Sequence, residues 1–290
     1  MCALDSLHGL GLGDALGSQF FYRHNYHALY ERRVPPGPWS WTDDTEMACS
    51  IYAVLCRFRS IDQDALAASF AERYDSARKY GPAMNRLLRQ VREGGAWREL
   101  AGGLFGGQGS WGNGAAMRVA PLGGWFAEDP GEAARQAMVS AAVTHTHPEA
   151  VAGAVAVAVA AALAAGSGQL TPRAFLDAVG QLTPSGRVHG GIGVACDLVD
   201  IPSVAVAVEQ LGNGRNISAL DTVPFALWAA ARNLDDYEEA IWTTAGAGGD
   251  VDTTCAIVGG IVAARVGRQG LPAAWRSACE PLPAWVDSEK

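Results

Sequence analysis

The sequence predicts an all-α fold that forms a single compact multi-helix domain over residues 1–290. Apolar residues recur at helical spacing, as Met47, Ile51 and Leu55 do within residues 45–58. Alternating runs bounded by hairpin turns, which would indicate strands, are scarce. Neither a long polar linker nor a fixed-period repeat interrupts the chain, so we expect one domain and no solenoid.

The expected helices follow one another with glycine-rich joins between them. Two glycines inside the last long helix, Gly259 and Gly260, would each cost roughly 1 kcal/mol relative to alanine, which indicates close helix–helix packing there. The joins are expected at residues 94–95, 102–114, 186–193 and 246–249. The helices are expected at residues 45–58, 63–79, 82–93, 115–125, 132–143, 148–165, 173–181, 193–198, 204–211, 218–232, 237–244 and 253–266.

Composition limits the classes of partner. The formal net charge is −8 and no run of Lys or Arg is present, which argues against a nucleic-acid-binding face. Nearly half of the residues are hydrophobic, so a sizeable core is available. If the substrate is an anion, its charge has to be met locally by loop N–H groups, helix N-termini or metal ions.

Cysteine usage and the chain ends indicate a cytoplasmic protein. The six cysteines form no C-x-x-C pair and read as reduced thiols. Residues 1–13 lack the basic and apolar regions of a signal peptide. Residues 150–165 are almost entirely Ala and Val but fall short of the roughly 20 residues that span a membrane, so we expect a buried helix and no membrane association.

Two short acidic clusters, about 200 residues apart, are the strongest chemical signal. They are TDDT at residues 42–45 and DVDT at residues 250–253. Carboxylate and hydroxyl oxygens suit hard cations such as Mg²⁺ or Mn²⁺. The alternative is helix capping, in which Asp43 and Glu46 would form a capping box. Because a cap needs one oxygen and each cluster holds two aspartates, we favour metal binding if folding brings the clusters together.

The loop GGQGSWGNG at residues 106–114 is a candidate phosphate or ribose cradle. Five glycines in nine residues let the backbone approach a ligand and turn N–H groups toward it. A flexible surface loop is the alternative. No G-K-[ST] follows, so the loop is not a P-loop.

Three further segments contain candidates for a ligand pocket. His145 and His147 open the Ala/Val helix without a Cys or Glu at zinc-like spacing, so we expect His145 to hydrogen-bond a ligand and His147 either to start the helix or to support a residue that contacts the ligand. Asp14 lies in an apolar stretch and needs partners, either a ligand or a helix N-terminus. Gly81 could line the same pocket.

In order along the chain, six blocks resemble the ADP-ribosylglycohydrolase family. They are GDALG (13–17), WTDDTEMA (41–48), YG (80–81), FGGQGSWGNGAAMR (105–118), TH (144–145) and GGDVDTT (248–254). Together they span nearly the whole chain. The resemblance implies an all-α hydrolase with two Mg²⁺ or Mn²⁺ ions that cleaves the bond at ribose C1″ of ADP-ribose in modified proteins or small molecules. We expect a monomer.

The resemblance also implies roles for individual residues. Asp43 or Asp44 would position or deprotonate the attacking water. Asp252 would bridge the ions. The implied metal ligands are Thr42, Asp43, Asp44, Asp250, Asp252 and Thr253, and the implied substrate-binding residues are Asp14, Gly81, Phe105, Gly107, Gly109, Ser110, Trp111, Gly112, Asn113 and His145.

The loop spelling G-x-G-S-W-G-N-G looks most like the branch acting on O-linked ADP-ribose: serine adducts, poly-ADP-ribose and O-acetyl-ADP-ribose. Many family members carry a Glu shortly after GD-x-x-G that reaches the second metal, whereas here no acid follows Gly17 before Glu31. The alternatives are therefore an arginine-linked ADP-ribose hydrolase and a non-catalytic ADP-ribose-binding relative. On chemistry alone, two-metal phosphatases and nucleases use similar carboxylate sites.

Overall fold

The fold is built from helices throughout the described part of the chain. The structure, a computed structural model, describes residues 2–166, 168 and 170–288. These residues form 18 α-helices and four short 3₁₀ helices. Their sheet-like contacts are two isolated bridges, between Trp39 and Cys279 and between Gly112 and Ser218. The all-α prediction is confirmed.

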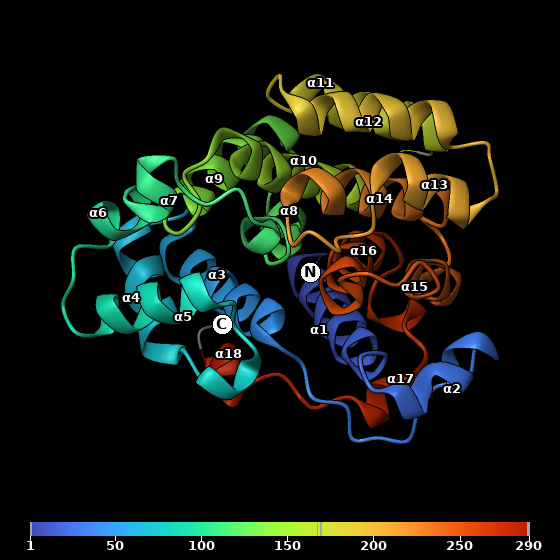
Figure 1. The fold of residues 1–290 in the computed structure, drawn as a ribbon, viewed down its shortest axis with the longest axis horizontal. Helices are drawn as coiled ribbons and strands as arrows, with labels where there is room; N and C mark the ends of the chain where they lie inside the picture. Colours follow the sequence, from blue (N-terminus) through green and yellow to red (C-terminus); the bar gives the residue numbers. More distant parts are fainter. Residues whose placement is uncertain (1, 167, 169, 289–290) are drawn as a thin grey trace.

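Two long helices, α1 (Cys2–Gln19) and α16 (Val251–Val266), pack against each other at the centre of the molecule (Figure 1). Their contact is made by glycines on both sides. A Cβ atom at Gly259 would lie 2.5 Å from the carbonyl oxygen of Gly9, and one at Gly260 would lie 2.6 Å from the Cβ atom of Ala120. Close packing at the glycine pair of the last long helix is therefore confirmed, and it holds the middle of α16 against α1.

The remaining helices surround this pair. The Ala/Val segment forms α10 (Pro148–Ala165), which is apolar and long enough to cross a membrane by length and composition but is 72% buried inside the protein. The helices packed on the central pair are α3 (Asp43–Phe58), α8 (Ala120–Trp125), α10, α14 (Ala219–Arg232) and α15 (Tyr237–Ala245). The outer helices are α2 (Tyr26–Tyr30), α4 (Gln63–Arg73), α5 (Pro82–Arg92), α6 (Trp97–Gly102), α7 (Leu104–Gly107), α9 (Pro130–Ala142), α11 (Pro172–Leu182), α12 (Arg187–Leu198), α13 (Val204–Leu211), α17 (Ala273–Ala278) and α18 (Ala284–Ser288).

Several expected boundaries are wrong. The helix expected at residues 63–79 ends at Arg73, and a 3₁₀ turn capped by Asp75 follows. The helix expected at residues 115–125 is a 3₁₀ turn, Asn113–Ala115, followed by α8. The join expected at residues 186–193 is helical, because the carboxylate of Glu149 accepts hydrogen bonds from the first two N–H groups of α12 at 2.8 and 2.9 Å.

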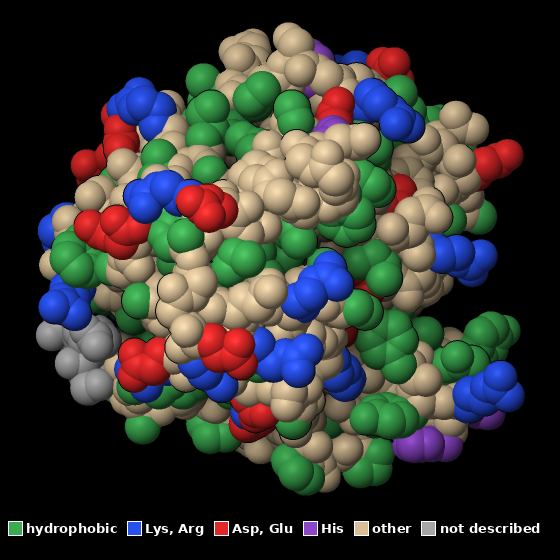
Figure 2. Space-filling model, turned by 60° about the vertical axis from the view of Figure 1, so that its left-hand side comes forward, with side chains coloured by type: hydrophobic (Ala, Val, Ile, Leu, Met, Phe, Trp, Pro, Cys, Tyr) green, Lys and Arg blue, Asp and Glu red, His purple; other side chains and the backbone are tan. Residues whose placement is uncertain are grey.

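The surface carries charges of both signs. On the face shown in Figure 2, Lys and Arg side chains are interspersed with Asp and Glu, and a hollow opens on the right-hand side of the view. Surface ion pairs of this kind contribute little stability individually.

Candidate metal centre and ligand pocket

Three helices bring the acidic residues together. Asp14 comes from the last turns of α1, Asp44 from the first turn of α3 and Asp252 from the first turn of α16. One carboxylate oxygen of each lies within 4.8 Å of the others, and all three side chains are buried. The two acidic clusters of the sequence therefore meet in the fold, together with the candidate acid of the first helix.

Asp14 holds the N-terminus of α3 in place. Its Oδ2 atom accepts hydrogen bonds from the backbone N–H of Thr42 at 2.8 Å and from the Thr45 hydroxyl at 2.5 Å. Its Oδ1 atom lies 2.9 Å from the Thr42 hydroxyl. Burial raises the pKa of Asp14 to about 6, although the bonds from Thr45 and Thr42 act in the opposite direction. Asp14 does not line the ligand cavity described below, so its contact with substrate stays a prediction.

The capping-box interpretation of Asp43 and Glu46 is wrong. Thr42 is the N-cap of α3, and its hydroxyl accepts from the N–H of Asp44 at 3.4 Å. Glu46 faces the other way, where its carboxylate accepts from the Tyr80 hydroxyl at 2.6 Å. Neither aspartate of the first cluster is therefore needed as the cap of α3.

Unsatisfied oxygens at the cluster are available to coordinate a cation. The single hydroxyl proton of Thr42 faces two carboxylate oxygens, Oδ1 of Asp14 and Oδ2 of Asp44, both at 2.9 Å, and it can serve only one at a time. The Oδ1 atom of Asp44 is buried without a hydrogen-bond partner among the described residues. Buried polar atoms in proteins nearly always have a partner, and a carboxylate oxygen that lacks one within the protein is often satisfied by a bound ion or water.

The electrostatics lead to the same conclusion. Burial, followed by the charges of Asp14, Asp250 and Glu46, raises the pKa of Asp43 to about 8. Burial and neighbouring carboxylates likewise raise the pKa values of Asp44 and Asp252 well above their ordinary range. Several buried like charges stay ionised together only when a cation offsets their repulsion. An all-oxygen donor set of this kind fits Mg²⁺ or Mn²⁺.

The second cluster is presented at the start of α16. Asp250 is the N-cap residue, but its side chain makes no capping hydrogen bond. Its Oδ2 atom accepts from the Asn113 amide at 2.7 Å instead, while the Oδ1 atom of Asp252 accepts from the N–H of Thr253 at 2.8 Å. Asn113 therefore ties the glycine loop directly to the acidic cluster.

A cavity of about 400 Å³ opens over the acidic cluster. Most of the predicted site residues line it. These are Asp43, Asp44, Gly81, Phe105, Ser110, Trp111, Gly112, Asn113, His145, Asp250, Asp252 and Thr253. Thr42, Gly107 and Gly109 are not part of the lining, although Thr42 contacts Asp44 from beneath.

Several glycines of the loop occupy positions where a side chain would clash or where the backbone is left-handed. A Cβ atom at Gly114 would lie 2.8 Å from Cε1 of His145. Phe105, Gly106, Gly107 and Gly109 all have φ between 53° and 86°, the left-handed region that glycine tolerates best. Phe105 is the one residue of that series that is not glycine, and its ring lies beside that of Trp111, with centroids 4.8 Å apart.

The two histidines have different roles. The Nδ1 atom of His145 lies 2.7 Å from the Thr144 hydroxyl, and burial lowers the pKa of this ring to about 3, so the ring is neutral. His147 is the N-cap of α10, and its Nδ1 atom accepts from the N–H of Glu149 at 3.2 Å. The expected helix-start role of His147 is confirmed, and His145 lines the cavity.

The sequence analysis missed one charged residue of the cavity. Lys79 is the single Lys or Arg among the described residues that line it. It has a left-handed φ of 68°, and its Nζ atom lies 5.6 Å from the ring centroid of Phe21. The neighbouring YG pair was the available signal, but the sequence does not show that the turn before α5 faces the acidic cluster.

Comparison with known proteins identifies relatives over nearly the full length. A family model described as ADP-ribosylglycohydrolase matches residues 3–288. An uncharacterized protein of Archaeoglobus fulgidus is 33% identical over 305 residues, covering 89% of this chain and 85% of that protein. ADP-ribosylhydrolase ARH3 of Gallus gallus is 28% identical and that of Homo sapiens 27%; each alignment covers 94% of this chain and 88% of the relative.

A solved structure described as an ADP-ribosylglycohydrolase-related protein complex shares the fold. Its TM-score is 0.70 at 24% sequence identity, and the match covers 99% of this chain and 94% of that one. The likeness supports the all-α architecture independently of the site residues.

Proposed function

Since this chain belongs to the ADP-ribosylglycohydrolase family, whose members cleave the glycosidic bond of ADP-ribose, we propose that it is a metal-dependent hydrolase acting on O-linked ADP-ribose. The acceptor would be serine, poly-ADP-ribose or the acetate of O-acetyl-ADP-ribose. The observation that carries the proposal is the buried cluster of Asp14, Asp44 and Asp252 beneath a cavity rimmed by the glycine loop. Relatives named ADP-ribosylhydrolase ARH3 support an ADP-ribosylated substrate, while the O-linkage is our own proposal.

We propose that the cluster holds two ions of Mg²⁺ or Mn²⁺. Thr42, Asp43 and Asp44 would hold one ion, Asp250 and Thr253 the other, and Asp252 would bridge them. The buried, unpartnered Oδ1 atom of Asp44 supports an ion beside that residue, and Asp43, Asp250 and Thr253 line the cavity next to the cluster of Asp14, Asp44 and Asp252. When bound, the ions would orient the ribose hydroxyls and offset charge that develops at the leaving oxygen.

One of the protein's own carboxylates would act as the general base that accepts the proton of the attacking water. Asp43 and Asp44 both line the cavity, so either can accept that proton while C1″ gains oxocarbenium character. Asn113 keeps the Asp250 carboxylate in place through the 2.7 Å hydrogen bond, and Asp14 keeps the start of α3 in place. These bonds preorganise the site, which is where such a catalyst gains most of its rate.

The remaining lining would bind the rest of ADP-ribose. We assign the diphosphate to the glycine loop and Lys79, because Lys79 is the cation that the described lining offers. The exposed rings of Phe105 and Trp111 lie side by side at the cavity and offer a stacking surface for the adenine. The neutral ring of His145 would hydrogen-bond the ligand from below.

The segment after α1 bears on the choice of acceptor. Glu31, the first acid after Gly17, lies at the surface near Arg33 and 3.2 Å from His27. It therefore does not replace the acid that many relatives use at the second metal. An acid at this position would be a metal ligand and not a partner of the acceptor, so its absence leaves both O-linked and arginine-linked acceptors open to the assay below.

A release assay tests the linkage. Protein loaded with Mg²⁺ or Mn²⁺ would be incubated separately with a serine-linked ADP-ribosyl peptide, an arginine-linked peptide and O-acetyl-ADP-ribose, and free ADP-ribose would be measured. We expect release from the O-linked substrates. Release from the arginine-linked peptide alone would overturn the linkage assignment, and ADP-ribose binding without release from any substrate would identify a non-catalytic relative.

A further inference from the structure

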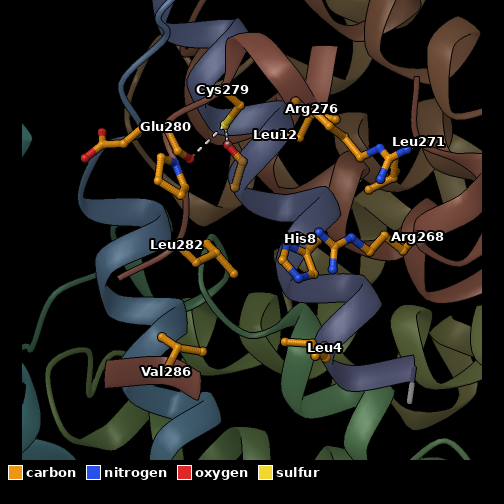
Figure 3. A pocket seen from close by; sticks show the side chains of 12 residues that line it. Leu4, His8, Leu12, Arg268, Leu271, Arg276, Cys279, Glu280, Leu282 and Val286 are labelled. Atoms are coloured by element: carbon orange, nitrogen blue, oxygen red, sulfur yellow. Dashed lines mark hydrogen bonds between the residues drawn. The ribbon is translucent and has the colours of Figure 1, made fainter. Parts of the chain in front are cut away.

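A second cavity, of about 300 Å³, lies between α1, the turn after α16, α17 and the C-terminal segment (Figure 3). None of its lining residues lines the cavity over the acidic cluster. It is therefore a separate site, and the reaction proposed above does not use it.

Two arginines that pair with no described residue enter this cavity. Arg268, in the 3₁₀ turn after α16, and Arg276, on α17, both line it. Neither forms an ion pair or a side-chain hydrogen bond with any residue of the described chain. By contrast Arg265, one turn earlier, pairs with Asp235 at 2.9 Å. Two such guanidinium groups at one cavity, in a protein with a net charge of −8, are well placed to bind an anion.

Glu280, the acid in the lining, forms an ion pair with an arginine outside the cavity. Both carboxylate oxygens of Glu280 accept hydrogen bonds from Arg78 at 2.8 Å, and Figure 3 shows the side chain of Glu280 pointing away from Arg268 and Arg276. Asp5, one turn before His8 on α1, forms no ion pair with either arginine within the described residues. Among the described residues, no carboxylate therefore forms an ion pair with Arg268 or Arg276.

The rest of the lining is mostly aliphatic. In Figure 3 the imidazole of His8 lies beside the guanidinium of Arg268, while leucines and a valine close the other sides. The aliphatic residues of the lining are Leu4, Leu12, Leu271, Leu282 and Val286. A ligand that fills this space needs an apolar body as well as a negative charge, because inorganic ions would leave the aliphatic wall in contact with water.

We propose that this cavity binds a small organic acid, with the carboxylate held by Arg268 and Arg276 and the hydrocarbon body lying on the leucine and valine side chains. Arginine suits this role because its planar fork matches carboxylate geometry. The proposal concerns a second ligand and does not depend on the acceptor of the hydrolase.

A titration by ligand-observed NMR in EDTA tests it, since EDTA removes binding through metal ions. The probes are acetate, hexanoate and inorganic phosphate. Hexanoate should bind more tightly than acetate, with each buried methylene adding roughly fourfold in affinity. Phosphate should bind more weakly than hexanoate, because it has charge but no apolar body.

Two double variants locate the binding. Arg268→Ala with Arg276→Ala should weaken hexanoate binding by roughly tenfold or more, the loss expected for a charge-assisted pair. Arg23→Ala with Arg187→Ala removes the same charge from exposed arginines that do not line the cavity, and it should leave the affinity unchanged. All four side chains are exposed, so both proteins should fold, which their melting temperatures would verify. Equal affinity in the two double variants, or hexanoate binding no tighter than acetate, would overturn the proposal.

Discussion

A Cβ atom at Gly17 would lie 2.8 Å from the Cα atom of Asp252. The last turn of α1 therefore touches the backbone of the second acidic cluster at a point where only glycine fits. Asp14 lies one turn earlier on the same helix and holds the start of α3. One helix thus sets the positions of both acidic clusters, through a close backbone contact on one side and hydrogen bonds on the other.

Gly17→Ala should displace the start of α16. The added methyl group would push against Val251 and Asp252, and overpacking of this kind costs typically 1–3 kcal/mol. Gly190→Ala is the matched control, because a Cβ there meets nothing within 4 Å and lies in the exposed part of α12. The free energy of unfolding of the control variant should rise by about 0.5–1 kcal/mol. Urea unfolding curves would compare them, and equal free energies of unfolding would contradict the account.

The central helix α1 is the longest helix that the sequence analysis did not predict. Apolar residues occur on every side of residues 2–19, and four glycines interrupt them, so they form no single helical stripe. The glycines look like breaks in the sequence, yet Gly9, Gly13 and Gly17 are there because α16 lies against them. Helices with one apolar face, such as α3, were predictable, because their pattern depends only on the local sequence.

The sequence indicated the types of residue in the site more fully than their arrangement. The two acidic clusters and the glycine loop are recognisable from local chemistry alone. Lys79 is not recognisable in this way, because the turn before α5 places it in the cavity. The hydrogen bond from Asn113 to Asp250, which are 137 positions apart, is not recognisable either. Contacts of this kind are determined by packing between distant helices.

Removing either candidate base should abolish most of the activity. Asp43→Ala and Asp44→Ala should each lower kcat by two or more orders of magnitude, a plausible loss for a general base or a metal ligand. Asp64→Ala, an exposed acid paired with Arg98, serves as the control and should retain wild-type turnover. Near-wild-type rates in both site variants would refute the mechanism.

The metal-free protein should lose stability as the pH rises. The raised pKa of Asp43, about 8, means that the folded state binds this proton more tightly than the unfolded chain. Its contribution is complete below the unfolded pKa of about 4 and is lost as the pH passes through about 8. Above about pH 6.5 His145 is neutral in both the folded and the unfolded state, so the carboxylates determine how stability changes with pH in that range.

Melting temperatures in EDTA should therefore fall between about pH 6.5 and about 8.5. Mg²⁺ or Mn²⁺ should raise them most at the upper end, where fewer protons compete for the carboxylates. In the same series with Asp44→Asn, metal should raise the melting temperature by less. A melting temperature that is independent of metal across this range would contradict a metal centre.

Lys79→Ala should weaken substrate binding without slowing the chemical step. Loss of one exposed charge facing the diphosphate should raise KM by roughly tenfold and leave kcat within about twofold. Lys79→Arg should restore most of the affinity, because the charge is kept. Measuring KM against ionic strength separates this role from a structural one. Screening by salt should weaken substrate binding by the wild type more than substrate binding by the alanine variant.

The most direct test of the account is metal-dependent turnover by a protein stripped of metal. The EDTA-treated and dialysed enzyme should release no ADP-ribose from its O-linked substrate, and adding Mg²⁺ or Mn²⁺ should restore release in the wild type but not in Asp44→Ala. Full activity in the stripped protein, or restoration to the same level in Asp44→Ala, would show that the acidic cluster is not the metal centre of the reaction.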